Sequence, residues 1–322
     1  MRNPSATLLK LVAVLISVVA CAKTPAIAPT LPVPLPSQTP YNTPPPGLTA
    51  SLSAPSTIPP QLPAERSQTA TATSTKLTAT LGLEPADWKN WPVLPIVPER
   101  ALQVYQLGRS LGNDPHAFSI LGDCQSVPEV FMGVYESDPT TLTLLPSDLQ
   151  ETVKWFWGSF NRQSPTVRTG TTTGALLWAL WHQNKFTCGS SETPLHCELR
   201  IHKPSFVIIQ VGTHAESHNE NYMRLILDQL LAAGVVPILS TKADDYEGDE
   251  HVNAQYAQLA VEYNLPFWNF WLAVNSLPDR GLYSKPQDTY QGGYWLTDDA
   301  VAIHRLTALQ ALDLVRRSVG DK

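Results

Sequence analysis

One stretch of the sequence, Ser205-Phe-Val-Ile-Ile-Gln-Val-Gly212, restricts the possible folds more than any other. It is an almost continuous run of apolar, mostly β-branched residues, which is typical of a strand buried on both faces. Residues 235–239 and 265–271 form two further apolar runs, and amphipathic helical spacing covers 222–233 and 252–263. Strands that alternate with amphipathic helices predict a parallel sheet with helices on both faces.

The remaining elements are predicted from the same kinds of pattern and from local stop signals such as Gly112-Asn113. They are helices at 98–112, 153–160 and 178–181, a last helix whose buried residues lie within 308–319, and strands at 116–121 and 166–169, the second of which ends at Gly170.

The N-terminus, 1–21, has the composition of an export signal. Arg2 and Lys10 are basic, and an uninterrupted apolar run covers 11–20. That run is about half the roughly 20 residues that a membrane-spanning helix needs. Its end, Val-Val-Ala-Cys21, resembles a bacterial lipobox, in which the cysteine is lipidated and becomes the mature N-terminus; an ordinary cleaved signal is the alternative. We therefore expect an extracytoplasmic protein that is anchored to the cell membrane by lipid on Cys21.

A Pro/Thr/Ser-rich segment follows over 22–86, with Pro44-Pro45-Pro46 near its middle. It has too few apolar residues to offset the entropy cost of ordering, so we expect an extended, disordered tether. The remaining residues, 87–322, are within the size range of one folded domain.

The charge of the chain narrows the possible partners. The formal net charge is −6, so no basic surface for nucleic acid is expected. We interpret the acidic positions Asp244-Asp245 and 247–250 as a solvated loop rather than a metal site. No metal or organic cofactor is implied, and we expect a monomer whose membrane contact is limited to the lipid.

Two cysteines, Cys188 and Cys197, bracket a short Gly/Ser-containing loop. Outside the cytoplasm such a pair favours a disulfide. A metal site is the alternative, but no Cys-x-x-Cys spacing supports it. With Cys21 lipidated and this pair oxidised, Cys124 is the remaining free thiol.

Cys124 follows the first predicted strand, in the sequence Gly122-Asp123-Cys124. A thiol just past a strand end lies where open α/β sheets bind ligands. The alternative is an inert, buried cysteine in a loop. The choice between them depends on partners elsewhere in the chain.

The motif Gly122-Asp123-Cys124, the glycine Gly170 and the later Gly212-Thr213-His214 together resemble the motifs of the SGNH (GDSL-type) hydrolase family. The resemblance covers residues 98–320. It implies a flavodoxin-like three-layer α/β/α sandwich and the hydrolysis of esters through an acyl-enzyme, with no cofactor.

The resemblance also implies roles for individual residues. Cys124 stands at the nucleophile position, where the family has serine, and Gly170 would supply an oxyanion-hole amide. His214 stands where the family has an oxyanion-hole asparagine. The family's Asp-x-x-His is matched to Asp288-Thr-Tyr-Gln291. Asp123 and the strand-end residue Asn269 are expected at the pocket, although Trp271 beside Asn269 is equally consistent with core packing.

The chain departs from the family at three of the four motifs. A cysteine can still act as a nucleophile, and a helix expected after Cys124 would favour its thiolate. Gln291 is the serious departure, because an amide cannot accept a proton as a general base. His304, at the expected start of the last helix, is a candidate replacement. His251 is another, although we favour a surface or capping role for it.

These observations leave three hypotheses. The first is an extracytoplasmic esterase that removes acyl or acetyl groups from a carbohydrate or lipid through a site centred on Cys124. The second is a protein that lacks catalysis and binds an envelope glycan or small ligand in the same cleft. The third, a purely structural lipoprotein, is supported by little beyond the tether. Fold alone cannot separate the first two, because function depends on the site.

Overall fold

The computed structural model describes residues 82–182, 186–284 and 293–320. The predicted lipidation of Cys21, the signal at 1–21 and all but the last residues of the tether at 22–86 therefore lie outside the described residues. Regular structure begins with a 3₁₀ helix, η1 (Pro85–Asn90), and Trp88 within it is buried.

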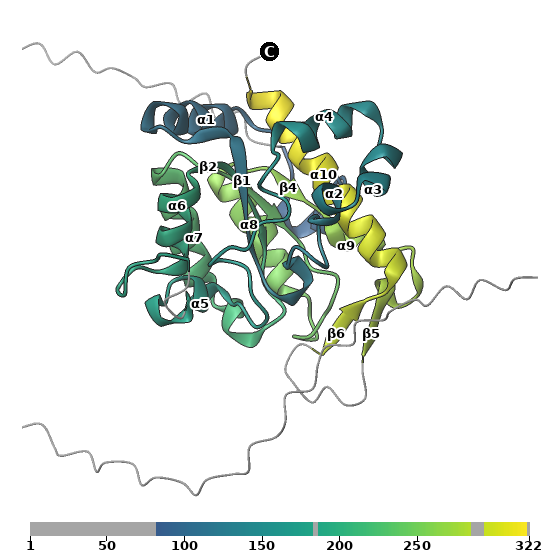
Figure 1. Ribbon diagram of the computed structural model, residues 1–322. Helices are drawn as coiled ribbons and strands as arrows, with labels where there is room; N and C mark the ends of the chain where they lie inside the picture. The colour runs from purple at the N-terminus through teal and green to yellow at the C-terminus, as the bar shows by residue number, and fades with distance from the viewer. Residues whose placement is uncertain (1–81, 183–185, 285–292, 321–322) are drawn as a thin grey trace, which may run out of the picture. The chain divides into compact units, whose positions relative to one another are not determined.

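A four-stranded parallel sheet forms the centre of the described chain (Figure 1). Its strands are β1 (Asp114–Gly122), β2 (Pro204–Gln210), β3 (Val236–Ser240) and β4 (Phe267–Trp268), in spatial order β1-β2-β3-β4. All four strands therefore present their carboxyl ends at the same edge of the sheet.

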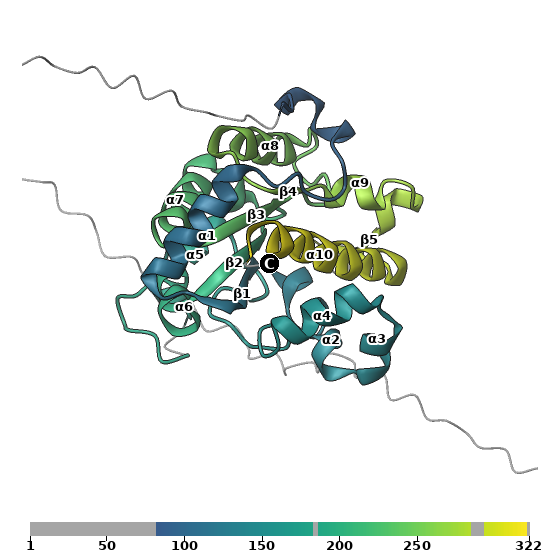
Figure 2. The same ribbon diagram turned by 90° about the horizontal axis from the view of Figure 1, so that it is seen from above.

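Helices flank this sheet on both faces, as Figures 1 and 2 show. The α-helices are α1 (Glu99–Leu111), α2 (Val134–Ser137), α3 (Pro139–Leu144), α4 (Ser147–Trp155), α5 (Thr173–Leu176), α6 (Pro194–His202), α7 (Glu220–Ala232), α8 (His251–Tyr263), α9 (Phe270–Val274) and α10 (Asp298–Val319). The further 3₁₀ helices are η2 (Cys124–Ser126), η3 (Ala179–His182), η4 (Ala215–His218) and η5 (Pro278–Gly281), and an antiparallel hairpin joins β5 (Leu282–Ser284) to β6 (Tyr294–Leu296).

The predicted α/β class, with its parallel sheet and helices on both faces, is confirmed. The apolar runs at 205–212 and 235–239 became β2 and β3, which are buried along nearly all of their length. The amphipathic stretches at 222–233 and 252–263 became α7 and α8, which follow those two strands. Among the described residues, no helix is both long enough and apolar enough to cross a membrane.

Aromatic side chains fill much of the space between β1, β2 and the helices beside them. Phe118 packs edge-on against Phe156 and Phe160, and Phe206 stacks with Tyr105 at 5.5 Å between ring centroids. Each of these five side chains is at most 5% exposed. Burial of one such ring contributes about 1.5–3 kcal/mol, so this cluster holds α1 and the segment after α4 firmly to the sheet.

Helix α1 meets the turn before β3 at two glycines. A Cβ atom built on Gly108 would lie 2.1 Å from the carbonyl oxygen of Gly234, and one built on Gly234 would lie 2.3 Å from the amide nitrogen of Gly108. The Asn113 side chain donates hydrogen bonds to the carbonyls of Ala233 and Gly234, at 2.9 and 3.2 Å. The helix therefore touches the turn backbone to backbone.

The strand predicted over 265–271 is much shorter than expected, because only Phe267 and Trp268 pair with β3. Asn269 ends the strand, since its side chain accepts a hydrogen bond from the Leu272 amide and caps α9. An apolar run predicts burial, but it does not distinguish a strand from a short buried helix.

Three other predictions were wrong in extent or type. The helix predicted over 153–160 ends with α4 at its third residue, and the chain continues in turns. The strand predicted over 166–169 is one isolated parallel bridge between Val167 and Gly122. The helix predicted over 178–181 is the 3₁₀ helix η3.

The predicted disulfide is present and joins Cys188 to Cys197, with 5.4 Å between their Cα atoms. It ties the loop before α6 to the second turn of that helix. Within the described residues, Cys124 is the one free cysteine.

Candidate active site

The site is built where β1 ends, at Gly122. A Cβ atom at this position would lie 2.2 Å from Cβ of Ser126 and 2.3 Å from its Oγ. Glycine is therefore required for the chain to turn back over the strand end. The Asp123 carboxylate accepts a hydrogen bond from the Gln125 amide at 3.0 Å, which closes the turn and begins η2.

The helix expected after Cys124 is absent: η2 is a three-residue 3₁₀ helix, too short to supply a helix dipole. Burial, and then the negative charge of Asp123, raise the pKa of the Cys124 thiol to about 12. At neutral pH such a thiol is ionised on the order of once in 10⁵ molecules. The expected activation of Cys124 as a thiolate is therefore wrong for this arrangement.

Asp123 lies beside Cys124 and is 4% exposed. Burial raises the pKa of its carboxyl to about 6, and the nearby Asp244 also raises it. The Gln125 amide and the charge of His214 act in the opposite direction. His214, the residue before η4, is thus close enough to Asp123 to influence its charge.

His304 lies inside α10, six residues after its first residue, Asp298, and not at the start of the helix as expected. Its side chain is 1% exposed and packs against Phe131 and Phe270, with ring centroids 4.3 and 4.5 Å apart. Its Nε2 shares a hydrogen bond with Oε1 of Gln210. Burial lowers the pKa of His304 to about 3, so the imidazole is neutral and a poor general base.

The roles expected for Asp288, Gln291, Gly170 and His214 are not tested by the structure. Asp288 and Gln291 lie outside the described residues. Gly170 follows the bridge at Val167, and a Cβ atom there would be 3.8 Å from the Trp181 ring; its role as an oxyanion donor, like that of His214, stays a prediction.

Asn269 is fully buried and its polar atoms are used within the protein. Its Nδ2 donates to the carbonyl of Trp88 at 2.8 Å, and its Oδ1 accepts from Thr241 and Leu272. Trp271 packs edge-on against Trp88 at 5.2 Å, and its indole N–H donates to Glu250. Both residues hold the strand end and α9 in place.

A small cavity of about 50 Å³ lies beside this turn. Its walls come from the segments after the strands, from α9 and α10 and from the β5–β6 hairpin. The lining residues are Asp123, Gln125, Ser126, Gln210, Val211, Thr213, Ser240, Thr241, Lys242, Ala243, Asp244, Phe270, Leu282, Tyr294, Leu296 and His304. Two buried atoms of this lining, Oγ of Ser126 and Nδ1 of His304, have no hydrogen-bond partner among the described residues.

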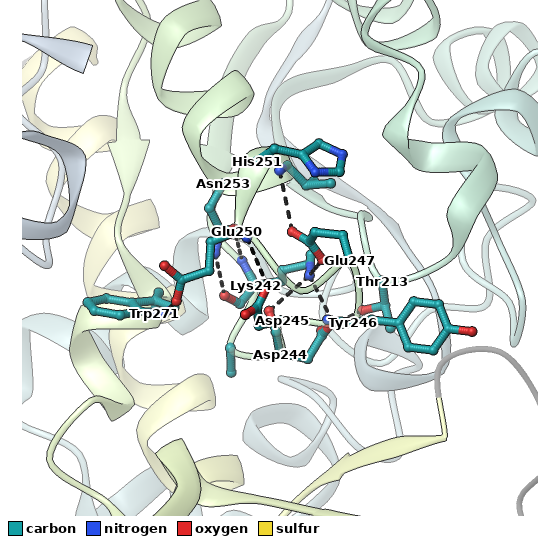
Figure 3. Close-up of polar contacts among 12 residues, drawn as sticks. Thr213, Lys242, Asp244, Asp245, Tyr246, Glu247, Glu250, His251, Asn253 and Trp271 are labelled. Carbon is teal, nitrogen blue, oxygen red and sulfur yellow. Dashed lines mark hydrogen bonds and ion pairs between the residues drawn. The ribbon is translucent and has the colours of Figure 1, made fainter. Parts of the chain in front are cut away.

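The loop after β3 contains a buried ion cluster, shown in Figure 3. Lys242 is 9% exposed, and its ammonium donates to Oδ1 and to the carbonyl of Asp244, at 2.8 and 2.9 Å, and to Glu247 at 2.5 Å. Thr213 donates to the other oxygen of Asp244 at 2.8 Å. The interpretation of this acidic stretch as a solvated loop is wrong for Asp244 and Glu247, whose side chains are 7% and 2% exposed.

Sequence reasoning missed Ser126, Gln210 and Lys242 as parts of the site. Lys242 had a usable signal, since it lies two residues after the end of a buried strand and precedes the acids Asp244 and Glu247 by two and five positions. Such spacing allows a lysine to fold back on its own loop. Gln210 and Ser126 carry no comparable signal, because their positions depend on how β1, β2 and α10 meet.

Comparisons with known proteins give similarity of fold only. No family model matches the chain, and no curated protein matches it. A GDSL-like lipase from Bacteroides thetaiotaomicron has a similar structure, with a TM-score of 0.40 and 13% identity over 66% of this chain and 97% of that one. A proposed acylhydrolase from Bacteroides fragilis gives a TM-score of 0.41 and 13% identity over 67% and 96%. At this identity no catalytic residue is carried over.

Proposed function

We propose that this protein binds a small ligand or a sugar unit of a cell-envelope glycan at the carboxyl end of its sheet, without appreciable ester hydrolysis. The fold is of the kind found in GDSL-like lipases. The proposed activity is ligand binding in the position where such a hydrolase would carry out its chemistry.

The state of Cys124 supports this proposal. Its thiol is held neutral by burial and by the neighbouring carboxylate, and among the described residues no imidazole hydrogen-bonds to its sulfur. The one buried histidine of the cavity, His304, is engaged with Gln210. A nucleophile needs either a lowered pKa or an adjacent base, and the described residues provide neither for Cys124.

The lining of the cavity suits a ligand with hydroxyl groups on an apolar framework. Asp123 and Ser126 offer hydrogen-bonding atoms, while Phe270 and Leu296 supply apolar contact. Sugar units carry hydroxyl and hydroxymethyl groups on a C–H framework. Because the cavity of about 50 Å³ is too small for a whole ring, one such substituent would enter it.

The experiment compares turnover of p-nitrophenyl acetate by the wild type, by Cys124→Ala and by Cys124→Ser combined with Gln291→His. We expect wild type and Cys124→Ala to match the uncatalysed rate, and the double variant to gain activity if the cleft is intact. A positioned base typically contributes about 10²–10⁴-fold. A robust wild-type rate that is lost in Cys124→Ala contradicts the proposal.

Binding itself is tested by protein-detected NMR with a panel of envelope disaccharides, free and O-acetylated. We expect saturable shifts in the wild type that are absent in Ser126→Leu, which fills the cavity. Shifts that persist in Ser126→Leu would place the ligand elsewhere.

Ester hydrolysis through Cys124 is the second candidate function. The observation that favours it is the position of the thiol, which is only partly buried and lies at the carboxyl end of β1. The acyl or acetyl esters of a carbohydrate or lipid would then be the substrates. The turnover experiment above separates the two functions.

We also propose that the folded domain at 87–322 works outside the cytoplasm, held at the membrane by a lipid on Cys21 and separated from it by the segment 22–86. The support for this is the sequence of the N-terminus.

A further inference from the structure

Two histidines and two acids meet at the sheet edge beside the Lys242 cluster, on segments far apart in the sequence. His218 is the last residue of η4, which follows β2, and His251 is the first residue of α8, which follows β3. Glu247 and Asp249 precede His251 in the same loop; Figure 3 shows Glu247 and His251. The ligand atoms of Glu247, Asp249 and His251 lie within 4.8 Å of one another.

We propose that His218, Glu247, Asp249 and His251 form a binding site for a zinc-type divalent metal ion. Imidazole nitrogens with carboxylate oxygens are a usual ligand set for four-coordinate zinc. Two imidazoles favour such an ion over calcium or magnesium, which take oxygen ligands.

His218 points to a ligand independently of the acidic loop. Its Nε2 is shielded from solvent and has no hydrogen-bond partner among the described residues. The backbone of Gly212 hydrogen-bonds to this imidazole, which leaves the Nε2 lone pair available. Metal-binding histidines usually donate their second ring nitrogen to a carbonyl or carboxylate in this way.

The spacing of the two imidazoles fits a shared metal. Their ring centroids are 5.2 Å apart and the rings are nearly perpendicular, at 89°. A zinc–nitrogen bond of about 2.0–2.1 Å puts each centroid about 3.2 Å from the metal, and a tetrahedral angle then separates the centroids by about 5.2 Å. The carboxylate of Asp249, whose side chain is 67% exposed, already contacts Nδ1 of His251.

The charge of the surroundings also favours a divalent cation. The Lys242 ammonium pairs with both Asp244 and Glu247, and Asp249 lies beside Glu247 and the His251 ring. These three carboxylates and one ammonium leave the cluster with an excess of negative charge, which a divalent cation would neutralise. Glu247 can serve both ions, because its Oε2 holds Lys242 while its Oε1 receives only a long hydrogen bond of 3.4 Å from the Val252 amide.

The experiment uses the full-length chain, stripped with EDTA and titrated with Zn²⁺ by calorimetry and with Co²⁺ by absorption. We expect one zinc per chain, a cobalt spectrum of tetrahedral type and no saturable Ca²⁺ binding. Single changes His218→Ala and His251→Ala should each weaken zinc binding at least 10–100-fold, since even second-shell changes have effects of that size. His196→Ala, at an exposed position on α6, is the matched control and should leave affinity unchanged.

Circular dichroism of the metal-free variants checks their folding, and the wild-type cobalt spectrum tests the ligand set even if a variant does not fold. Wild-type protein that takes up no stoichiometric zinc refutes the proposal. So does zinc binding of unchanged affinity in both His218→Ala and His251→Ala, or zinc binding that is weakened equally in His196→Ala. Neither outcome bears on the proposed ligand of the cavity, which is tested without metal.

Discussion

The buried ammonium of Lys242 allows a quantitative test of the loop that carries the site. In Lys242→Met the aliphatic stem is kept and the charge is removed. The carboxylates of Asp244 and Glu247 then remain almost inaccessible to solvent, at 7% and 2%, without their cation. Breaking one partner of a buried ion pair typically costs about 3–5 kcal/mol, because the remaining charge is uncompensated.

We expect urea denaturation at neutral pH to show a loss of this size in the free energy of unfolding. For a domain of this length it corresponds to a fall in Tm of roughly 6–20 °C. Lys89→Met is the matched control. Lys89 also pairs with an acid, Glu250, but it is 50% exposed, and Glu250 keeps its hydrogen bond from Trp271. Surface pairs contribute about 0–1 kcal/mol, so the control should lose no more than that.

A double variant sharpens the test. Adding Glu247→Gln to Lys242→Met removes one of the two stranded charges, so part of the lost stability should return. A loss below about 1 kcal/mol in Lys242→Met, or no recovery in the double variant, would show that the loop is hydrated in solution.

Three further predictions concern histidine and cysteine. The pKa of His304 is about 3 in the folded protein, below the ordinary value of 6.5 expected in the unfolded chain. The neutral imidazole therefore contributes fully to stability above about pH 6.5, and this contribution falls toward pH 3 by on the order of 1 kcal/mol per pH unit. His304→Gln should remove that part of the pH dependence of the free energy of unfolding, measured by urea denaturation. Reduction of Cys188–Cys197 should cost about 2–3 kcal/mol in the free energy of unfolding; peptide mapping without reductant that finds two free thiols contradicts the disulfide. Mass spectrometry of the mature protein should find an acylated Cys21 at its N-terminus, and an unmodified start elsewhere would argue for an ordinary signal peptide.

The sequence predicted the sheet and its main helices well because these depend on local patterns. The run at 205–212 is apolar and mostly β-branched apart from Ser205, Gln210 and the final glycine, a composition that favours a strand buried in a sheet. The last helix was predicted in its second half but not at its start. Its true start is set by Thr297, which accepts a hydrogen bond from the Ala300 amide, and by the acids Asp298 and Asp299 in the first turn. That capping signal was present in the sequence and was overlooked.

The site was predicted less well because its chemistry depends on tertiary burial. The position of Cys124 after β1 followed from the sequence, but its raised pKa depends on how the turn packs. The helical spacing from His304 to Ala308 predicts that the imidazole faces the core. The neighbouring sequence does not show that Phe131 and Phe270 enclose the ring, because both come from other parts of the chain. For the same reason, the charged pattern of the loop after β3 did not indicate which acids are buried around Lys242.

The backbone contact between Gly108 and Gly234 has a consequence for how this fold changes over evolutionary time. Any side chain at either position would overlap main-chain atoms of the other, and main-chain atoms cannot rotate away. A substitution at one glycine therefore cannot be rescued by a substitution at its partner. We expect both positions to tolerate no replacement while the surrounding helix surface drifts freely, so the pair can serve as an alignment anchor for relatives too distant for ordinary sequence comparison.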